Sequence, residues 1–173
     1  MLKSDGYAGL SLAKVADRAG ENKALISYHF GSREGLVAAA ARELGEAITT
    51  EILDGIEEAQ TVEEVVRGGV EGLWRVLERD ARVARVYLDL NAVSVVEEQV
   101  RAAIREIKAR WRAELSRLLR RAGVPPRRAG VGAKLLIAGH EGFSLDWLER
   151  GDTPELRGAR AMWVEAITSQ LAR

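Results

Sequence analysis

Four side chains that could bind a nucleic acid lie within one short segment of the chain. Residues 21–36 read ENKALISYHFGSREGL and include Lys23, Tyr28, His29 and Arg33. Cationic side chains bind phosphate oxygens, and polar side chains on a short helix can reach base edges. A core helix is usually longer and carries apolar residues along its whole length, so this segment is predicted to contact a partner.

The residues before this segment predict two short helices that meet across a tight turn. Ser11 can cap a helix that runs through Ala19, Gly20 can supply a positive φ, and Asn22 can cap a second helix over 23–30. This is the arrangement of a helix-turn-helix motif. The second helix of such a motif lies in the major groove of DNA, with its N-terminal residues on base edges.

Small and apolar residues occur at the spacing that this motif requires. Ala16 lies where the two helices approach most closely, and Ile26 fills the angle between them. Lys23, Ala24 and Tyr28 then fall on the outward side of the second helix, where they are predicted to face DNA.

The run Tyr28-His29-Phe30, followed by Gly31-Ser32-Arg33-Glu34 and Leu36, resembles the recognition-helix signature of the tetracycline-repressor (TetR) family of bacterial regulators. The resemblance covers about residues 6–44. It implies DNA contacts through Lys23 and Tyr28 to bases or backbone, and through Ser11, His29 and Arg33 to phosphates.

Some positions depart from the family pattern. Glu21 stands where the family usually has valine, and Ser27 stands where it usually has tyrosine. Family members also have a full first helix before the glycine-aromatic bend, whereas only Met1 to Asp5 precede Gly6 here. We therefore expect the N-terminal DNA-binding module to be incomplete in this sequence.

No catalytic or metal-binding pattern occurs in the sequence. His140-Glu141 begins like a zinc-protease motif, but Ser144 occupies the position of the second histidine, and His29 is distant in sequence. Glycine-rich phosphate loops and nucleophile elbows are also absent. We therefore expect no enzyme, no metal and no cofactor.

Composition sets the expected compartment and partners. The chain contains no cysteine, no apolar run near the roughly 20 residues that span a bilayer, and no signal-peptide pattern. We expect a cytoplasmic protein without a membrane partner.

Its net charge is zero, but acidic residues gather in 51–66 and basic ones in 101–128. These are predicted to be solvated helix faces, with a basic surface for nucleic acid or membrane as the alternative.

The whole sequence favours helix. Alanine, leucine, glutamate and arginine dominate, only three prolines occur, and no strand pattern is present, so the predicted class is all-α. Beyond the motif, apolar spacing predicts helices over 33–60, 62–77, 81–90, 104–122, 129–150 and 154–171. We expect an irregular join near 91–94. The predicted domains are a helix-turn-helix DNA-binding domain over 1–45 and a helical effector-binding and dimerisation domain over 46–173.

The helix expected over 129–150 is apolar on two faces, which indicates burial on two sides. A single body of 173 residues can hardly enclose both faces, so this helix and the last one predict an interface with a second copy of the chain. The predicted interface residues are Leu135, Gly142, Leu145, Leu156, Trp163 and Ile167.

Aromatic and polar-tipped residues on converging helices predict a small-molecule pocket. Its predicted lining is Trp74, Tyr87, Asn91, Trp111, His140, Phe143 and Trp147. His140 and Asn91 are the polar candidates, because an isolated polar group on an apolar face needs a partner. An ordinary core is the alternative for each residue singly.

Together these features predict a ligand-responsive transcriptional repressor. It is expected to bind a palindromic operator in double-stranded DNA as a homodimer, and to be released by a small-molecule effector. A helical dimeric small-molecule-binding module without DNA binding is the alternative.

Overall fold

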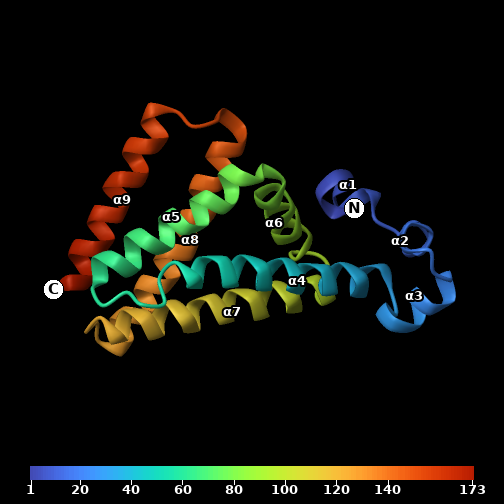
Figure 1. The fold of residues 1–173 in the computed structure, drawn as a ribbon, viewed down its shortest axis with the longest axis horizontal. Coiled ribbons are helices and arrows are strands. Elements are labelled where there is room, and N and C mark those ends of the chain that lie inside the picture. The colour runs from blue at the N-terminus through green and yellow to red at the C-terminus, as the bar shows by residue number, and fades with distance from the viewer. The chain divides into compact units, whose positions relative to one another are not determined.

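The protein is built of helices throughout the part of the chain that the structure describes (Figure 1). The computed structural model describes residues 1–173, except for the side chain of Asp54. The described helices are α1 (Leu2–Gly9), α2 (Leu12–Ala19), α3 (Lys23–Phe30), α4 (Arg33–Asp54), α5 (Val62–Arg79), α6 (Ala81–Val93), α7 (Glu98–Arg121), α8 (Pro126–Arg150) and α9 (Pro154–Ala172). The described residues contain no strand, which confirms the all-α class. None of the helices described is both long enough and apolar enough for a membrane crossing.

These helices form two compact units. The first contains Met1–Glu46 and Arg82–Ile107, and the second contains Ala47–Ala81 and Lys108–Arg173. Residues 82–107, which the sequence predicts to belong to the second domain, lie in the first unit with the helix-turn-helix. Apolar spacing shows that a helix has a buried face, but it does not show which neighbour covers that face.

The N-terminal helices of the first unit are short because local signals stop them. Gly20 and Gly31 end α2 and α3 with φ angles of 69° and 70°, a region that side-chain-bearing residues rarely adopt. The predicted bounds of both helices are confirmed.

The second unit is organised around α5, α8 and α9, which pack on one another in pairs (Figure 1). Its core contains side chains with almost no exposed surface, namely Val65, Val66, Leu118, Leu119 and Ala129. Helix α5 begins with a capping box, in which Thr61 and Glu64 exchange hydrogen bonds with each other's backbone amides. Hydrogen bonds from the amides of Gln60 and Thr61 hold the pKa of the Glu64 carboxyl below its usual value.

Several helix ends differ from the predicted ones. Helix α4 ends at Asp54 rather than residue 60, because turn hydrogen bonds from Gly55 to Ile52 and from Ile56 to Leu53 tighten the chain. Ile56 still has only 1 % of its surface exposed, so it belongs to the apolar stripe although it lies beyond the helix. Helix α6 continues to Val93 through most of the segment that was predicted to be irregular.

The acidic segment 51–66 and the basic segment 101–128 meet within the second unit. Arg117 forms an ion pair of 3.2 Å with Glu57, and Arg121 donates to the backbone carbonyls of Glu57 and Ala59. These contacts pair part of the basic segment with the acidic segment inside the unit.

Candidate functional site

Helices α2 and α3 form a rigid corner that is held by their caps. Ser11 Oγ accepts a hydrogen bond of 3.2 Å from the amide of Lys14, and Asn22 Oδ1 accepts one of 2.8 Å from the amide of Ala24. Ala16 has 2 % of its surface exposed and Ile26 has 7 %, which agrees with Ala16 at the close approach of the two helices and Ile26 in the angle between them. The corner thereby fixes the direction in which α3 presents its other face.

The outward face of α3 is free of protein contacts that would block a ligand. Lys23, Ala24 and His29 are exposed, and Tyr28 has 85 % of its surface exposed. The rings of Tyr28 and His29 meet edge to face, with centroids 5.7 Å apart. A large aromatic residue so accessible gains little from the fold, which makes it a candidate for contact with a partner.

Arg33 is engaged inside the first unit. Its Nε donates 2.7 Å to the carbonyl of Leu10, its Nη2 donates to the carbonyl of Tyr7, and its Cζ lies 3.9 Å from the Tyr7 ring centroid. It also lies 4.0 Å from Glu34. In this conformation Arg33 ties the bend after α1 to the start of α4, and its predicted contact with a phosphate stays a prediction. Sequence alone cannot distinguish an arginine that binds phosphate from one that binds a neighbouring carbonyl.

Three of the predicted pocket residues converge in the second unit. The ring of Trp74 on α5 meets two rings of α8 edge to face, His140 at 6.1 Å and Trp147 at 6.0 Å between centroids. Trp74 has 4 % and His140 has 8 % of its surface exposed. These residues form a cluster, called the aromatic cluster below, that includes one titratable ring.

The other predicted pocket residues have different neighbours. Phe143 packs on Trp163 of α9, with ring centroids 5.2 Å apart. Trp111 donates 2.6 Å from its Nε1 to Thr49 Oγ1. Tyr87 and Asn91 belong to the first unit, where Asn91 Nδ2 donates 2.9 Å to the carbonyl of Tyr87. The structure therefore supports a smaller cluster than the sequence predicted.

His140 is held in its neutral form. Burial, and secondly the positive charge of Arg160, lower the pKa of His140 to about 3. Its Nε2 shares a hydrogen bond of 3.1 Å with Ser144 Oγ, so Ser144 supplies the partner that the buried imidazole needs. The ring can therefore serve as a neutral hydrogen-bonding group at physiological pH.

Arg160 of α9 is not among the pocket residues predicted from the sequence. Its Cζ lies 3.8 Å from the ring centroid of Trp74, which adds a cation to the aromatic cluster. A signal was present, because Leu156, Arg160, Val164 and Ile167 follow the spacing of a single helix face. An arginine within an otherwise buried stripe marks a polar interior site.

The predicted dimer residues divide into two groups. Leu135, Gly142 and Leu145 of α8 are exposed, with 52 % of Leu135 and 50 % of Leu145 accessible. In contrast, Leu156 and Ile167 of α9 are buried inside the protomer at 3 % and 7 % exposure.

Trp163 is partly buried, because α9 turns this face toward α8. Helix α8 has Gly139 at the point where the Trp163 ring approaches it. Two further large apolar residues are exposed on these helices, Val131 on α8 and Met162 on α9, at 56 % and 72 %.

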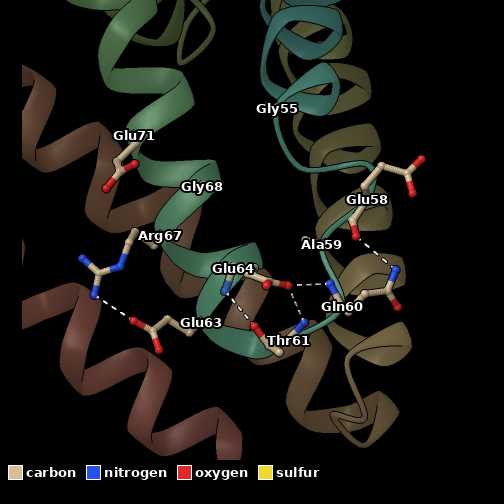
Figure 2. A pocket seen from close by; sticks show the side chains of 10 residues that line it. All are labelled: Gly55, Glu58, Ala59, Gln60, Thr61, Glu63, Glu64, Arg67, Gly68 and Glu71. Atoms are coloured by element: carbon tan, nitrogen blue, oxygen red, sulfur yellow. Dashed lines mark hydrogen bonds and ion pairs between the residues drawn. The ribbon is translucent and has the colours of Figure 1, made fainter.

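A surface hollow of about 640 Å³ lies where the segment after α4 enters α5 (Figure 2). Its lining includes Glu58, Glu63, Glu64 and Glu71. The close-up shows that Glu64 is engaged in the capping box and that Glu63 pairs with Arg67 at 3.1 Å (Figure 2). These groups stabilise the start of α5, and none of the lining residues belongs to the predicted pocket.

A short exposed helix held by a tight turn, followed by a long helix and an all-helical body, defines a helix-turn-helix DNA-binding protein. Residues 1–40 match the family model of the bacterial regulatory proteins of the tetR family. Residues 62–172 match that of the C-terminal domain of BetI-type transcriptional repressors. The chain therefore belongs to the tetR family of bacterial transcriptional regulators, with a C-terminal domain of the BetI type.

Individual relatives agree with this assignment. The chain is 27 % identical to the HTH-type transcriptional regulator BetI 1 of Chromohalobacter salexigens, over 97 % of this chain and 83 % of that protein. Its fold is similar to that of a transcriptional regulator from a Rhodococcus species, with a TM-score of 0.79 and 22 % identity over 98 % of this chain and 90 % of the other.

The fold is also similar to that of the regulator FadR from Bacillus subtilis, solved in complex with stearoyl-CoA. Here the TM-score is 0.72 and the identity 18 %, over 97 % of this chain and 92 % of the other.

The protein is thus a DNA-binding transcriptional regulator and not an enzyme.

Proposed function

We propose that this regulator is a repressor that binds a palindromic operator as a homodimer and is released by a small-molecule effector. The observation that carries the proposal is the accessible face of α3, where Lys23, Ala24 and Tyr28 are exposed beside a fully capped helix corner. A helix in this setting fits the major groove.

In the proposed complex with DNA, each polar side chain of the α2–α3 corner has a defined role. Lys23 and Tyr28 contact base edges or backbone, and His29 contacts a phosphate from the end of α3. Ser11 accepts the amide of Lys14 and keeps its own hydroxyl hydrogen for donation to a phosphate. Arg33 supports the corner from within, because it holds the carbonyls of Tyr7 and Leu10.

The homodimer is supported by the exposed apolar side chains of the last two helices. Val131, Leu135, Gly142 and Leu145 step by four, seven and three residues along α8, a spacing that places them along one face, and Met162 is exposed on α9. A second copy of the chain would cover these side chains with the same residues, as twofold symmetry requires. Two α3 helices about 34–36 Å apart would then meet successive major grooves.

The effector is proposed to bind at the aromatic cluster of Trp74, His140 and Trp147. Aromatic walls with a few polar groups are typical of small-molecule sites. The effector would release DNA only if it binds more tightly to a dimer whose α3 helices no longer match the operator spacing.

The test is fluorescence-anisotropy titration with labelled DNA from the region that flanks the protein's own gene. We expect specific binding that weakens steeply with salt, together with loss of affinity in Lys23→Ala and Tyr28→Ala. Arg127→Ala is the matched control, since Arg127 is an exposed cation of the second unit. If a genome-wide selection of DNA fragments also yields no specific site, the alternative of a dimeric ligand-binding module without DNA binding is correct.

A further inference from the structure

Arg160 is a partly buried cation of the second unit, and it has no anionic partner among the described residues. The guanidinium group of Arg160 stacks on the indole of Trp74, with 3.8 Å from its Cζ to the ring centroid. Its Nη1 is buried and has no hydrogen-bond partner among the described residues. No ion pair joins Arg160 to a carboxylate within this described part of the chain.

A second buried donor belongs to the same pair of residues. Trp74 is 4 % exposed, and its Nε1 is also without a hydrogen-bond partner among the residues described. The neighbouring His140 is neutral and is satisfied by Ser144. The cluster therefore holds one positive charge and two unused N–H donors.

Such an arrangement costs free energy in the absence of a ligand. A buried donor without an acceptor loses its hydration, and the loss is larger for a charged group. The face of the Trp74 ring stabilises the cation, but the N–H groups of both residues lie in their own planes and need oxygen acceptors. An arginine kept only for stability would normally be paired, and an apolar residue of similar volume would serve better than an unpaired one.

We propose that the effector carries an anionic group, a carboxylate or a phosphate, which accepts hydrogen bonds from Arg160 Nη1 and Trp74 Nε1. This inference rests on the proposed effector site and names its chemical class. The apolar part of the effector packs on the ring of Trp147, which lies 6.0 Å from that of Trp74.

Because Arg160 Nη1 and Trp74 Nε1 are both buried, α9 must move away from α5 for the effector to reach them. The bound and free arrangements of these helices then differ in affinity for the anion, which is the condition for a ligand-driven shift.

The direct test measures the binding of a defined set of probes to the full chain by thermal shift and tryptophan fluorescence. The anionic probes are acetate, octanoate, benzoate, inorganic phosphate and octyl phosphate. Octanamide and octyltrimethylammonium provide the matched neutral and cationic probes. We expect at least one anion to raise the melting temperature, and its affinity to fall about tenfold to a hundredfold in Arg160→Gln and in Trp74→Phe. Arg127→Gln, which removes an exposed cation, should leave the affinity unchanged.

A second measurement does not depend on the choice of probe. If Arg160 is a binding group, Arg160→Met should leave the melting temperature of the ligand-free protein unchanged or raise it. A structural arginine would give the opposite result, with a lower melting temperature in Arg160→Met. The inference is overturned by that decrease, by a set of anions that bind no better than octanamide, or by anion binding that persists in Arg160→Gln.

These outcomes are separable from failure of the proposed function. Operator binding is measured without effector, so its absence contradicts the repressor and leaves the thermal-shift result standing. A protein that binds its operator but retains full anion affinity in Arg160→Gln contradicts only the inference on effector class.

Discussion

The guanidinium group of Arg33 lies over the ring of Tyr7, with 3.9 Å between Cζ and the ring centroid. The same group donates to the backbone carbonyls of Tyr7 and Leu10. One side chain at the start of α4 thus holds the bend between α1 and α2. The helix-turn-helix is positioned by this contact as well as by its apolar centre.

Replacement of Arg33 should therefore lower the stability of the fold, and any loss of DNA binding should follow from that change. We expect Arg33→Ala to lower the free energy of unfolding by about 1–3 kcal/mol, because two charge-assisted hydrogen bonds and a cation–π contact are lost. Urea denaturation without DNA measures this value. An unchanged urea midpoint with weakened DNA binding would instead support Arg33 as a phosphate contact.

Lys23→Ala should change the salt dependence of DNA binding. If Lys23 contacts a phosphate, the slope of log K against log salt should become less negative by about 0.9 per contact removed. Anisotropy titrations at several salt concentrations give this slope, with Arg127→Ala as the control. A slope unchanged while sequence discrimination is lost would show that Lys23 contacts a base edge.

A charged residue at Leu145 should separate the proposed dimer. We expect Leu145→Glu to weaken dimerisation by on the order of a hundredfold, because the carboxylate would be buried without a partner in the interface. Sedimentation velocity reports the association state, and circular dichroism shows whether the protomer remains folded. Val96→Glu is the control, since Val96 is 75 % exposed in the first unit. A wild-type protein that sediments as a monomer would contradict the homodimer.

Gly139 should tolerate no side chain. A methyl group at this position would lie 2.4 Å from Trp163 Cζ2 and 2.7 Å from its Nε1. We expect Gly139→Ala to destabilise the protein by about 1–3 kcal/mol through overpacking.

The matched variant is Gly130→Ala in the same helix, where no atom lies within 4 Å of the added methyl group. Improved helix propensity should stabilise it by about 0.5–1 kcal/mol. Thermal melts of both variants compare the two effects directly, and equal shifts would contradict the close approach of Trp163 to α8.

The buried His140 should make stability fall in acid. Its pKa is about 3 in the folded protein, below its ordinary value, so between that value and about 6.5 the unfolded chain binds a proton that the folded chain does not. The free energy of unfolding therefore decreases as the pH is lowered through this range. His140→Gln should flatten the dependence of the urea midpoint on pH, whereas His29→Gln at an exposed position serves as the control. An identical pH profile in His140→Gln would contradict the burial of a neutral imidazole.

The sequence by itself determined the local structure around α2 and α3. Ser11, Gly20 and Asn22 specify caps and a left-handed turn through interactions that span only a few residues, and the small Ala16 and apolar Ile26 follow at fixed spacing. The predicted helix start at residue 154 is likewise confirmed, and Thr153 caps it by accepting a hydrogen bond from the amide of Leu156. These features could be predicted because the residues that cause them are near neighbours in the chain.

Tertiary structure decided which residues contact each other and which side chains are buried. Arg33 of α4 donates a hydrogen bond to the carbonyl of Tyr7, which is more than 20 residues earlier in the chain. The guanidinium group of Arg160 on α9 stacks on the ring of Trp74 on α5. Helix periodicity gave the apolar faces of α8 and α9, but it could not show that Leu156 and Ile167 face the protomer's own core while Leu135 and Leu145 remain exposed. Such assignments depend on the packing of helices that are distant in sequence, because burial of one face against another sets the free energy of the fold.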